Sequence, residues 1–335
     1  MKRILIATAA AAAIATSAGA AGFDRSGQPL GFLFEKGDYV ELSFGFVAPD
    51  VRRVPDAYGD VALDYYQYGL SYKTDLNEKV SLGVQFDQPW GARIDYLPTL
   101  PIEAHLKSSA INAIGRYKFN DALSVHGGVG VTTIGGFLRL PTTPGRLTFD
   151  SDTDVNWLVG VAYEKPEIAL RVALTYFSGT DHTLTSTPAL PNPNTINPPS
   201  TVNLDFQTGI AKDTLLFGQI RWGNWTETAI RVNATDIVTY QNDRFSYALG
   251  VGRRFNENWS GAVTFGYEEP EGGIASALSP TDGYRSIGLA ATYTMDNLKI
   301  TGGVRYVDIG DATASTGAFQ DNNAIGVGLR IGYSF

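Results

Sequence analysis

The sequence predicts an all-β protein, a 14-stranded antiparallel transmembrane β-barrel with a short N-terminal segment in its lumen. Three observations lead to this fold class. Apolar residues alternate with small or polar residues over most of the chain, as in strands with one apolar face. The connections between these strands alternate between short turns and long loops. The composition is low in charged residues, at 18%, and rich in glycine and aromatic residues, with 37 glycines, 17 tyrosines and 17 phenylalanines.

The composition also excludes several classes of protein. The 335 residues include no cysteine, so a disulfide framework and a thiolate metal site are ruled out. The net charge of −8 argues against nucleic acid as a partner. Beyond the N-terminus, no stretch approaches the run of about 18 apolar residues that a membrane-spanning helix needs. A chain that crosses a membrane without such helices must do so as a closed barrel.

Residues 1–20 have the features of a secretory signal peptide. Lys2 and Arg3 precede an alanine-rich apolar stretch, and Ala18-Gly19-Ala20 has the small-residue form of a cleavage site. We therefore exclude residues 1–20 from the fold and expect the protein to be exported.

Residues 21–37 precede the first strand and are too few to form a domain. They include apolar residues that we expect to contact a ligand, namely Phe23, Leu30, Phe32 and Phe34. Two interpretations remain open, a frayed terminus and a short plug folded into the lumen. The apolar content favours the plug, and the barrel then comprises residues 38–335.

The strands of the barrel are recognised by apolar residues at every second position. The clearest rows lie at residues 40–46, 80–86, 155–163, 168–176, 202–210, 259–267, 287–293 and 325–335. The opposite face of these rows is rich in Gly, Ser, Thr, Asn and scattered Arg. A soluble sandwich would carry Lys and Glu on its polar face, so this composition indicates a lumen.

The connections between strands are of two alternating kinds. Tight turns occur at residues 75–78, 120–122, 164–167, 212–213, 256–258 and 296–297. Long loops lie at about residues 49–60, 89–104, 141–149, 179–200, 223–242, 270–281 and 310–322. Six short and seven long connections join fourteen strands. An even strand number with this alternation is typical of a bacterial outer-membrane barrel, so we expect that location.

Three segments resemble the FadL/TodX family of outer-membrane transporters for long-chain fatty acids and other hydrophobic compounds. They are AGF at residues 21–23, LGVQFDQPWGARIDY at residues 82–96 and PSTVNLDFQTGIAKDTLLFGQIRWGNW at residues 199–225. The most specific parts are DQPWG at residues 87–91 and the pair Trp222 and Trp225. Residues 21–37 lack the Asn-Pro-Ala motif of the family's longer N-terminal hatch.

The resemblance implies capture of a hydrophobic molecule at the extracellular end, passage into the barrel, and sideways exit through the wall when the N-terminal segment shifts. A lateral gate requires a break in the strand ladder. Pro89 and Gly91 are the residues that we expect to make it, because proline cannot donate to a ladder. An ordinary extracellular turn at this place is the alternative.

Ligand contacts are expected from apolar residues of the second long loop at helix-like or irregular spacing, namely Trp90, Ile94, Tyr96, Leu97 and Leu100, and from two residues of the barrel, Phe177 and Phe217. The alternative is that this loop packs only on its neighbours. The proline-rich loop at residues 178–200 has little apolar content, and we expect it to shield the mouth of the barrel as an extended cover.

Charged residues with inward parity are predicted to line the lumen: Glu41, Arg171, Asp205, Arg221, Arg305 and Arg330. Arg171, Asp205 and Arg221 fall on three successive strands, and Glu41 is expected to meet Arg330 across the closing seam. Such arginines would match a substrate carboxylate in geometry. The more common arrangement is that lumen charges pair with each other.

The leading hypothesis is passive, substrate-selective uptake of hydrophobic small molecules. The alternatives are a general diffusion porin for small polar solutes and an outer-membrane lipid hydrolase. We expect no enzyme, no cofactor and no metal site, because His105, His126 and His182 form no catalytic or ligating cluster by spacing. The expected partners are a hydrophobic or fatty-acid ligand, outer-membrane lipid and lipopolysaccharide, and the barrel-assembly machinery during biogenesis.

Overall fold

The computed structural model describes residues 23–335. The predicted signal peptide, and the first two residues of the predicted plug, lie outside the described residues. Within residues 23–335 there is no α-helix, and no helix is long and apolar enough to cross a bilayer.

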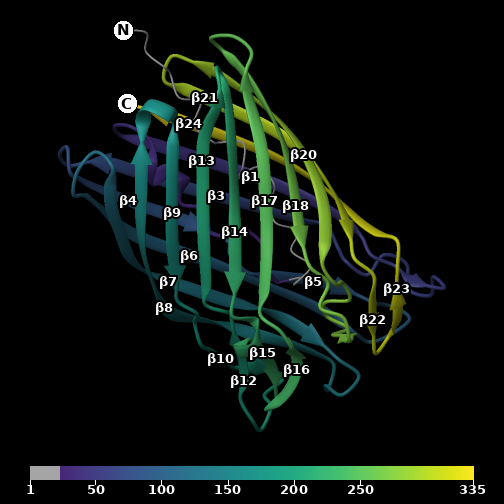
Figure 1. The fold of residues 1–335 in the computed structure, drawn as a ribbon. Coiled ribbons are helices and arrows are strands. Elements are labelled where there is room, and N and C mark those ends of the chain that lie inside the picture. Colours follow the sequence, from purple (N-terminus) through teal and green to yellow (C-terminus); the bar gives the residue numbers. More distant parts are fainter. Residues whose placement is uncertain (1–22) are drawn as a thin grey trace.

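Fourteen antiparallel strands form a closed barrel (Figure 1). Each strand pairs with its neighbours in chain order, β1 pairs with β24, and β8 pairs with β9. The barrel strands are β1 (Tyr39–Asp50), β3 (Tyr65–Asp75), β4 (Val80–Asp87), β6 (Glu103–Lys118), β7 (Leu123–Arg139), β8 (Arg146–Lys165), β9 (Leu170–Phe177), β13 (Thr201–Ala211), β14 (Thr214–Gly223), β17 (Arg244–Arg254), β18 (Trp259–Glu268), β20 (Tyr284–Met295), β21 (Leu298–Ile309) and β24 (Asn322–Ser334). The predicted strand number and the predicted alternation of short and long connections are confirmed.

The outer face of the barrel is apolar, as the period-two rows require. On β8, for example, Val155, Val159 and Val161 are 42–65% exposed, while the intervening Asn156 and Leu158 are buried. Exposed aromatic residues cluster near the short turns, namely Tyr117, Phe119, Tyr163, Phe255, Trp259, Tyr333 and Phe335. An outward apolar band flanked by aromatic side chains is the lipid-facing surface of an outer-membrane barrel. The short turns therefore lie on the periplasmic side and the long loops on the extracellular side.

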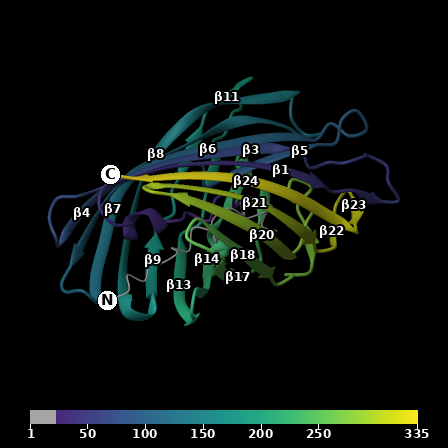
Figure 2. The same ribbon diagram turned by 90° about the horizontal axis from the view of Figure 1, so that it is seen from above.

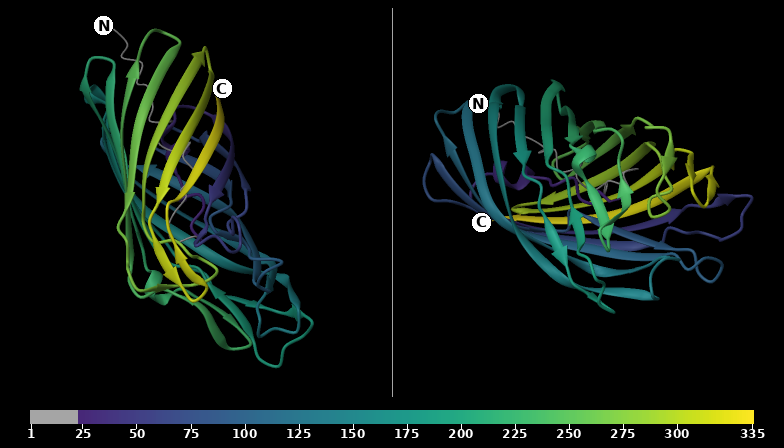
Figure 3. Two further views of the ribbon diagram at one scale, coloured as in Figure 1. Left: turned by 90° about the vertical axis from the view of Figure 1, so that its right-hand side faces the viewer. Right: turned by 90° about the horizontal axis from the view of Figure 1, so that it is seen from below.

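The barrel is taller on one side. Strands β6, β7 and β8 have 16, 17 and 20 residues, whereas β4 and β9 have 8 each. About 9–11 residues suffice to cross the membrane, so the three long strands continue beyond it at the loop end. Figure 3 shows this extension, and Figure 2 looks into the ring of strands from the short-turn end.

The long loops fold into a cover of short strands. One sheet has the order β10 (His182–Leu184), β12 (Asn194–Asn197), β15 (Ala229–Val232) and β16 (Thr235–Thr239), and a second has β19 (Ile274–Ala275), β22 (Ala312–Ala314), β23 (Gly317–Phe319) and β2 (Arg53–Val54). Two further strands extend the barrel sheet, β5 (Gly91–Asp95) beside β6 and β11 (Ser186–Thr187) beside β8. The proline-rich loop at 178–200 thus supplies β10, β11 and β12 to folded sheets, which its sequence did not predict.

Short 3₁₀ turns complete the chain at η2 (Gly31–Phe34), η3 (Pro166–Ile168) and η4 (Trp225–Glu227). The η2 turn lies inside the barrel near its periplasmic end, where Phe32 and Leu33 pack with Ile114 and Leu158 of the wall. Leu33 has no exposed surface. Lys73 of β3 holds this region in place, because its Nζ donates to the carbonyls of Glu35 at 2.9 Å and Gly37 at 2.8 Å.

The seam between β1 and β24 provides a first prediction. Tyr39 is 2% exposed and its ring lies against Gly332, so a Cβ at that position would overlap the Tyr39 hydroxyl. We expect Gly332→Val to destabilise the barrel by about 1–3 kcal/mol, the usual cost of overpacking. Urea titration followed by heat-modifiable gel migration measures this cost. Gly302→Val is the control, because a Cβ at Gly302 meets nothing within 4 Å; equal midpoints for the two variants would contradict the prediction.

Candidate functional site

The wall of the barrel is interrupted between β3 and β4. Their ladder runs from Asp75 opposite Ser81 to Leu70 opposite Phe86 and ends there. Residues 65–69 of β3 pair with β1 alone among the described strands. Pairing on the other side resumes only beyond the barrel proper, where Ala62 forms a bridge with Ile94. We call this interruption the gap. It is bounded at one end by the cross-strand pair of Leu70 and Phe86 and at the other end by the pair of Ala62 and Ile94.

A bulge between β4 and β5 makes the gap. Asp87 lies opposite Ala110 of β6, and Gly91 lies opposite Lys107, so four steps on one strand face three on the other. A bulge of this kind bends its strand away from the sheet. Pro89 lies in the bend and has no N–H to donate to β3. The chain therefore stays on β6 and leaves β3.

Side chains take over the lost backbone pairing on both sides of the bulge. The Ser108 hydroxyl lies 2.8 Å from both the N–H and the carbonyl of Trp90, which anchors the bend to β6. On the other side, the amide of Tyr68 donates to Oε1 of Gln88 at 3.0 Å. The Tyr68 N–H in the gap is therefore bonded to a side chain, which can separate from it without breaking a ladder.

The N-terminal segment, residues 23–37, closes the gap from the inside. Asp24 forms an antiparallel bridge with Trp90. The amide of Arg25 donates to the Pro89 carbonyl at 2.8 Å, and the amide of Gly91 donates to the Phe23 carbonyl at 2.9 Å. The Arg25 guanidinium also reaches the far side of the gap, with its Cζ 3.6 Å from the ring centre of Tyr65 on β3. Residues 23–25 thus occupy the place that β3 would have taken.

Arg221 of β14 fixes this segment to the opposite wall. Its Nε donates to Asp24 at 2.7 Å, and the same guanidinium donates to Asn203 at 2.8 Å and to Gln28 at 3.0 Å. The Arg221 and Asp24 side chains are only 5% and 11% exposed. A buried, multiply bonded ion pair is costly to break from one side, because it leaves an uncompensated charge.

We expect Arg221→Ala to release the upper part of the N-terminal segment. Losing one partner of a buried pair costs about 3–5 kcal/mol, which corresponds to a fall of about a hundredfold or more in hydrogen-exchange protection. Exchange of the amides of residues 24–28, followed by mass spectrometry, measures this fall. Arg254→Ala is the matched control, because Arg254 pairs with Asp213 at a distant short turn. Unchanged protection in Arg221→Ala would show that the segment is held by other contacts.

Aromatic side chains form a cluster above the gap. Trp90 stacks with Phe23 at 6.0 Å between ring centres and meets Trp225 edge-on at 6.0 Å; Trp225 in turn lies 4.8 Å from Tyr240. Beside this cluster lies an apolar cavity of about 70 Å³, whose walls include Val47, Val51, Tyr65, Ala92, Ile94 and Leu278. An apolar cavity therefore adjoins the gap on its extracellular side.

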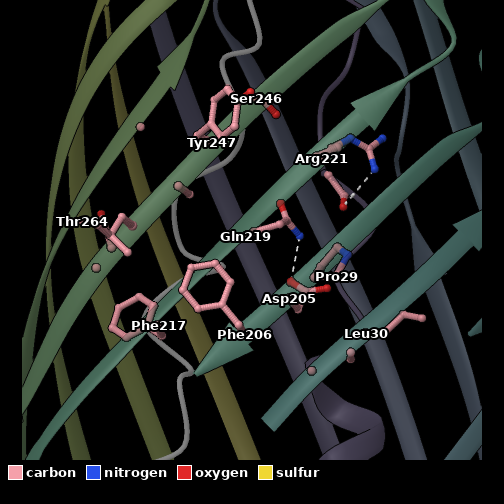
Figure 4. Close-up of a pocket in the computed structure, with 18 of the residues that line it drawn as sticks. Pro29, Leu30, Asp205, Phe206, Phe217, Gln219, Arg221, Ser246, Tyr247 and Thr264 are labelled. Carbon is pink, nitrogen blue, oxygen red and sulfur yellow. Dashed lines mark hydrogen bonds between the residues drawn. The ribbon is translucent and has the colours of Figure 1, made fainter. Parts of the chain in front are cut away.

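A second cavity, of about 150 Å³, lies inside the barrel between the N-terminal segment and β9–β24 (Figure 4). We call it the lumen pocket. Its apolar lining includes Leu30, Phe34, Phe217, Ala248 and Gly250, and its charged lining includes Glu35, Glu41, Arg171, Asp205, Arg221, Arg305 and Arg330.

No family model and no curated protein matches the chain. Solved structures do match it over nearly its full length. A FadL homologue of Pseudomonas aeruginosa is 13% identical, with 92% of each chain covered and a TM-score of 0.76. The Pseudomonas putida toluene transporter TodX and the Ralstonia pickettii toluene transporter TbuX are each 12% identical, with 90% of each chain covered and TM-scores of 0.65.

The chain has the FadL/TodX fold. At these identities the likeness establishes the architecture, and the predicted resemblance in fold is confirmed. The gap of this barrel lies at the DQPWG run, where the sequence predicted a break at Pro89 and Gly91.

The predicted apolar contact residues separate into three groups. Phe23 and Trp90 lie in the aromatic cluster, and Ile94 lines the cavity beside the gap. Leu30, Phe34 and Phe217 line the lumen pocket. Phe32 and Phe177 are 3% and 4% exposed and belong to a packed cluster inside the barrel, and Phe32 also lines the lumen pocket.

The second long loop is more regular and more buried than predicted. Irregular or helix-like structure was expected after Trp90, but residues 91–95 form β5 on the long edge of β6. Tyr96 has no exposed surface, and its hydroxyl donates to the Ala277 carbonyl at 2.8 Å. Burial raises the pKa of Tyr96 to about 12, so it remains a donor and holds the cover together. Leu97 and Leu100 are partly buried.

The charged side chains predicted to line the lumen do face inward, but several of their partners differ from those expected. Arg171, Asp205 and Arg221 do not pair with one another: Asp205 accepts from Gln219 at 2.9 Å (Figure 4), and Arg221 pairs with Asp24. Glu41 does meet Arg330 across the seam, at 3.3 Å. Arg305 donates to the Ser286 hydroxyl at 2.7 Å.

Asp24, Arg25, Ser108 and Gln88 belong to the site but were not predicted from the sequence. Their partners lie far away in sequence; Asp24 and Arg221, for example, are 197 positions apart. Trp225 was noted only for its resemblance, although its position after β14 places it in the aromatic cluster. Among the described residues, no group of three or more His, Asp or Glu side chains is arranged to hold a metal ion. His126 bonds Thr175 at 2.8 Å inside the lumen.

Proposed function

We propose that this barrel carries hydrophobic small molecules, such as fatty acids or hydrocarbons, passively across the outer membrane and releases them sideways through the gap. The observation that supports this most is the gap itself. A membrane-spanning barrel normally pairs every strand, because an unpaired backbone group costs several kcal/mol in lipid. Here the strands are unpaired at the gap, which is bridged by Gln88 and covered from the inside by residues 23–25. A barrel that served only as a closed pore would not need this interruption.

The surroundings of the gap suit an apolar cargo on both sides. Inside lies the apolar cavity with Tyr65 and Ile94 in its wall. Outside, Tyr66 and Tyr68 are 73% and 53% exposed to the membrane, and Tyr68 stacks on Phe86 at 5.8 Å. Transfer of a hydrophobic molecule into the bilayer is favourable by roughly 0.8 kcal/mol of free energy per CH₂, so release there needs no energy source.

The N-terminal segment is the part that we expect to move. Its upper residues contact the wall through side chains and two backbone hydrogen bonds, whereas η2 below is packed into the lumen. Displacing residues 23–25 would join the apolar cavity to the gap and leave the barrel strands in place. Pro89 and Gly91 then act as the gate. The lipid, lipopolysaccharide and assembly-machinery partners remain predictions.

The neighbours named above include toluene transporters, which supports a hydrophobic cargo, and no observation on the chain favours the porin alternative as strongly. A diffusion porin needs an open aqueous path, but here the N-terminal segment packs Leu30, Phe32 and Leu33 against the wall inside the lumen.

The test is uptake in a bacterial strain whose only outer-membrane transporter of this fold is the present chain. We expect faster uptake of toluene and of decanoate than in the empty strain, and no faster uptake of arabinose. Faster arabinose uptake with unchanged toluene and decanoate uptake would support the porin alternative instead.

A further inference from the structure

Two charged side chains of the lumen pocket, Arg171 and Asp205, differ from the other charged side chains there in their contacts. Most charges there are engaged: Arg221 with Asp24, Glu35 with Lys299 at 2.9 Å, and Glu41 with Arg330. Arg171 forms no ion pair with any residue in the described part of the chain. Its contact is with the ring of Phe34, whose centre lies 4.6 Å from the guanidinium carbon. Asp205 accepts a hydrogen bond from the neutral amide of Gln219.

Arg171 and Asp205 lie near each other on neighbouring strands. Asp205 of β13 is opposite Ala173 of β9, and Arg171 is opposite Gln207, so the two are diagonal neighbours on the inner face. Such positions have Cβ atoms about 7–8 Å apart. The two side chains nevertheless do not meet, because Phe34 holds the guanidinium and Gln219 holds the carboxylate. A cation and an anion on neighbouring strands therefore line one pocket without forming an ion pair with each other.

The apolar part of the same pocket completes an amphiphile site. Leu30, Phe217, Ala248 and Gly250 line it, and the absence of side chains at Gly250 leaves the Phe217 ring as the wall. A tail can lie there while a head group meets Arg171 and Asp205.

The charges decide which head group fits. A simple carboxylate would bind Arg171 but would lie beside the Asp205 carboxylate, and a simple ammonium would bind Asp205 but lie beside Arg171. A head group that carries an ammonium and a carboxylate on the same carbon can place each beside the residue of opposite charge. We infer that the lumen pocket binds amphiphiles with a zwitterionic, amino-acid-like head group, the carboxylate on Arg171 and the ammonium on Asp205. This inference rests on the proposed uptake function and specifies one cargo class within it.

The test is isothermal titration of the detergent-solubilised full chain with 2-aminooctanoate, octanoate, octylamine and octanol. We expect 2-aminooctanoate to bind at least about tenfold more tightly than either singly charged analogue, since each charge-assisted contact is stronger than a neutral one. Arg171→Gln should abolish its advantage over octylamine, and Asp205→Asn its advantage over octanoate. Arg254→Gln and Asp213→Asn, at a short turn away from the pocket, should leave all four affinities unchanged.

Equal binding of the three charged probes to the unaltered chain overturns the inference, whether or not the variants fold. A zwitterion preference that survives both substitutions also overturns it. Octanol separates this failure from failure of the proposed function. If octanol binds while the charged probes bind alike, only the zwitterion site is lost; if no probe binds, hydrophobic uptake through the lumen is contradicted as well.

Discussion

Deleting residues 23–36 should turn a poorly conducting barrel into an ion channel. The segment packs Leu30, Phe32 and Leu33 against Ile114 and Leu158 of the wall, so it fills one side of the lumen along most of its height. Without it, a 14-stranded ring remains. Barrels of 16–18 strands hold an aqueous channel and those of about 8 are filled by side chains, so an empty ring of this size should conduct. We expect single-protein conductance in planar bilayers to rise on the order of tenfold.

The deleted protein must first be shown to fold, by heat-modifiable migration and by the salt dependence of its current. Lys73 loses the carbonyl of Glu35 in this variant, but the Gly37 carbonyl stays in the chain and Asp75 stays at 2.6 Å from the Lys73 Nζ. Its charge therefore remains compensated. Equal currents from the deleted and complete proteins would mean that the segment does not obstruct the lumen in the membrane.

The strands of this protein could be predicted because their signal is local and repeated. In β8 and β24 exposed apolar residues recur at every second position, and five of the six tight turns contain Asn or Asp, while the turn after β8 contains Pro166 instead. The two extracellular sheets were not predictable in the same way. Their strands have two to five residues, which is too short for period two to be distinguished from chance.

The alternation of inward and outward positions along each strand predicted which charged side chains face the lumen, but it did not predict their partners. Arg171, Asp205 and Arg221 occupy the predicted face, yet each is held by a residue outside that trio: Phe34, Gln219 and Asp24. Two of these partners belong to the N-terminal segment, whose path through the lumen has no periodic signal in the sequence. The break at Pro89 was predictable because proline has a fixed consequence for a ladder, whereas its closure by Phe23–Arg25 depends on tertiary contacts.

The gap can be locked chemically, because the chain has no native cysteine. Tyr68 and Gln88 lie on the two sides of the gap, with the backbone amide of Tyr68 3.0 Å from Oε1 of Gln88. A double variant, Tyr68→Cys with Gln88→Cys, can be joined by a short bifunctional methanethiosulfonate that a reductant removes. The linker ties β3 to the bulge and holds the gap shut while the lumen and the loops stay as they are.

The matched control is Tyr72→Cys with Val84→Cys. These residues are direct partners on the same two strands, in the intact ladder just below the gap, and both face the membrane. A linker there should change nothing, because those strands are already paired. The control thus separates the effect of closing the gap from that of attaching a reagent to β3 and β4.

The most direct test of sideways release is the rate of toluene uptake by cells carrying the Tyr68→Cys, Gln88→Cys protein, measured before linking, after linking and after reduction. We expect linking to slow uptake at least about tenfold, equivalent to about 1.4 kcal/mol or more on the barrier, with recovery on reduction. Uptake that continues at the unlinked rate in fully linked protein would contradict release through the gap.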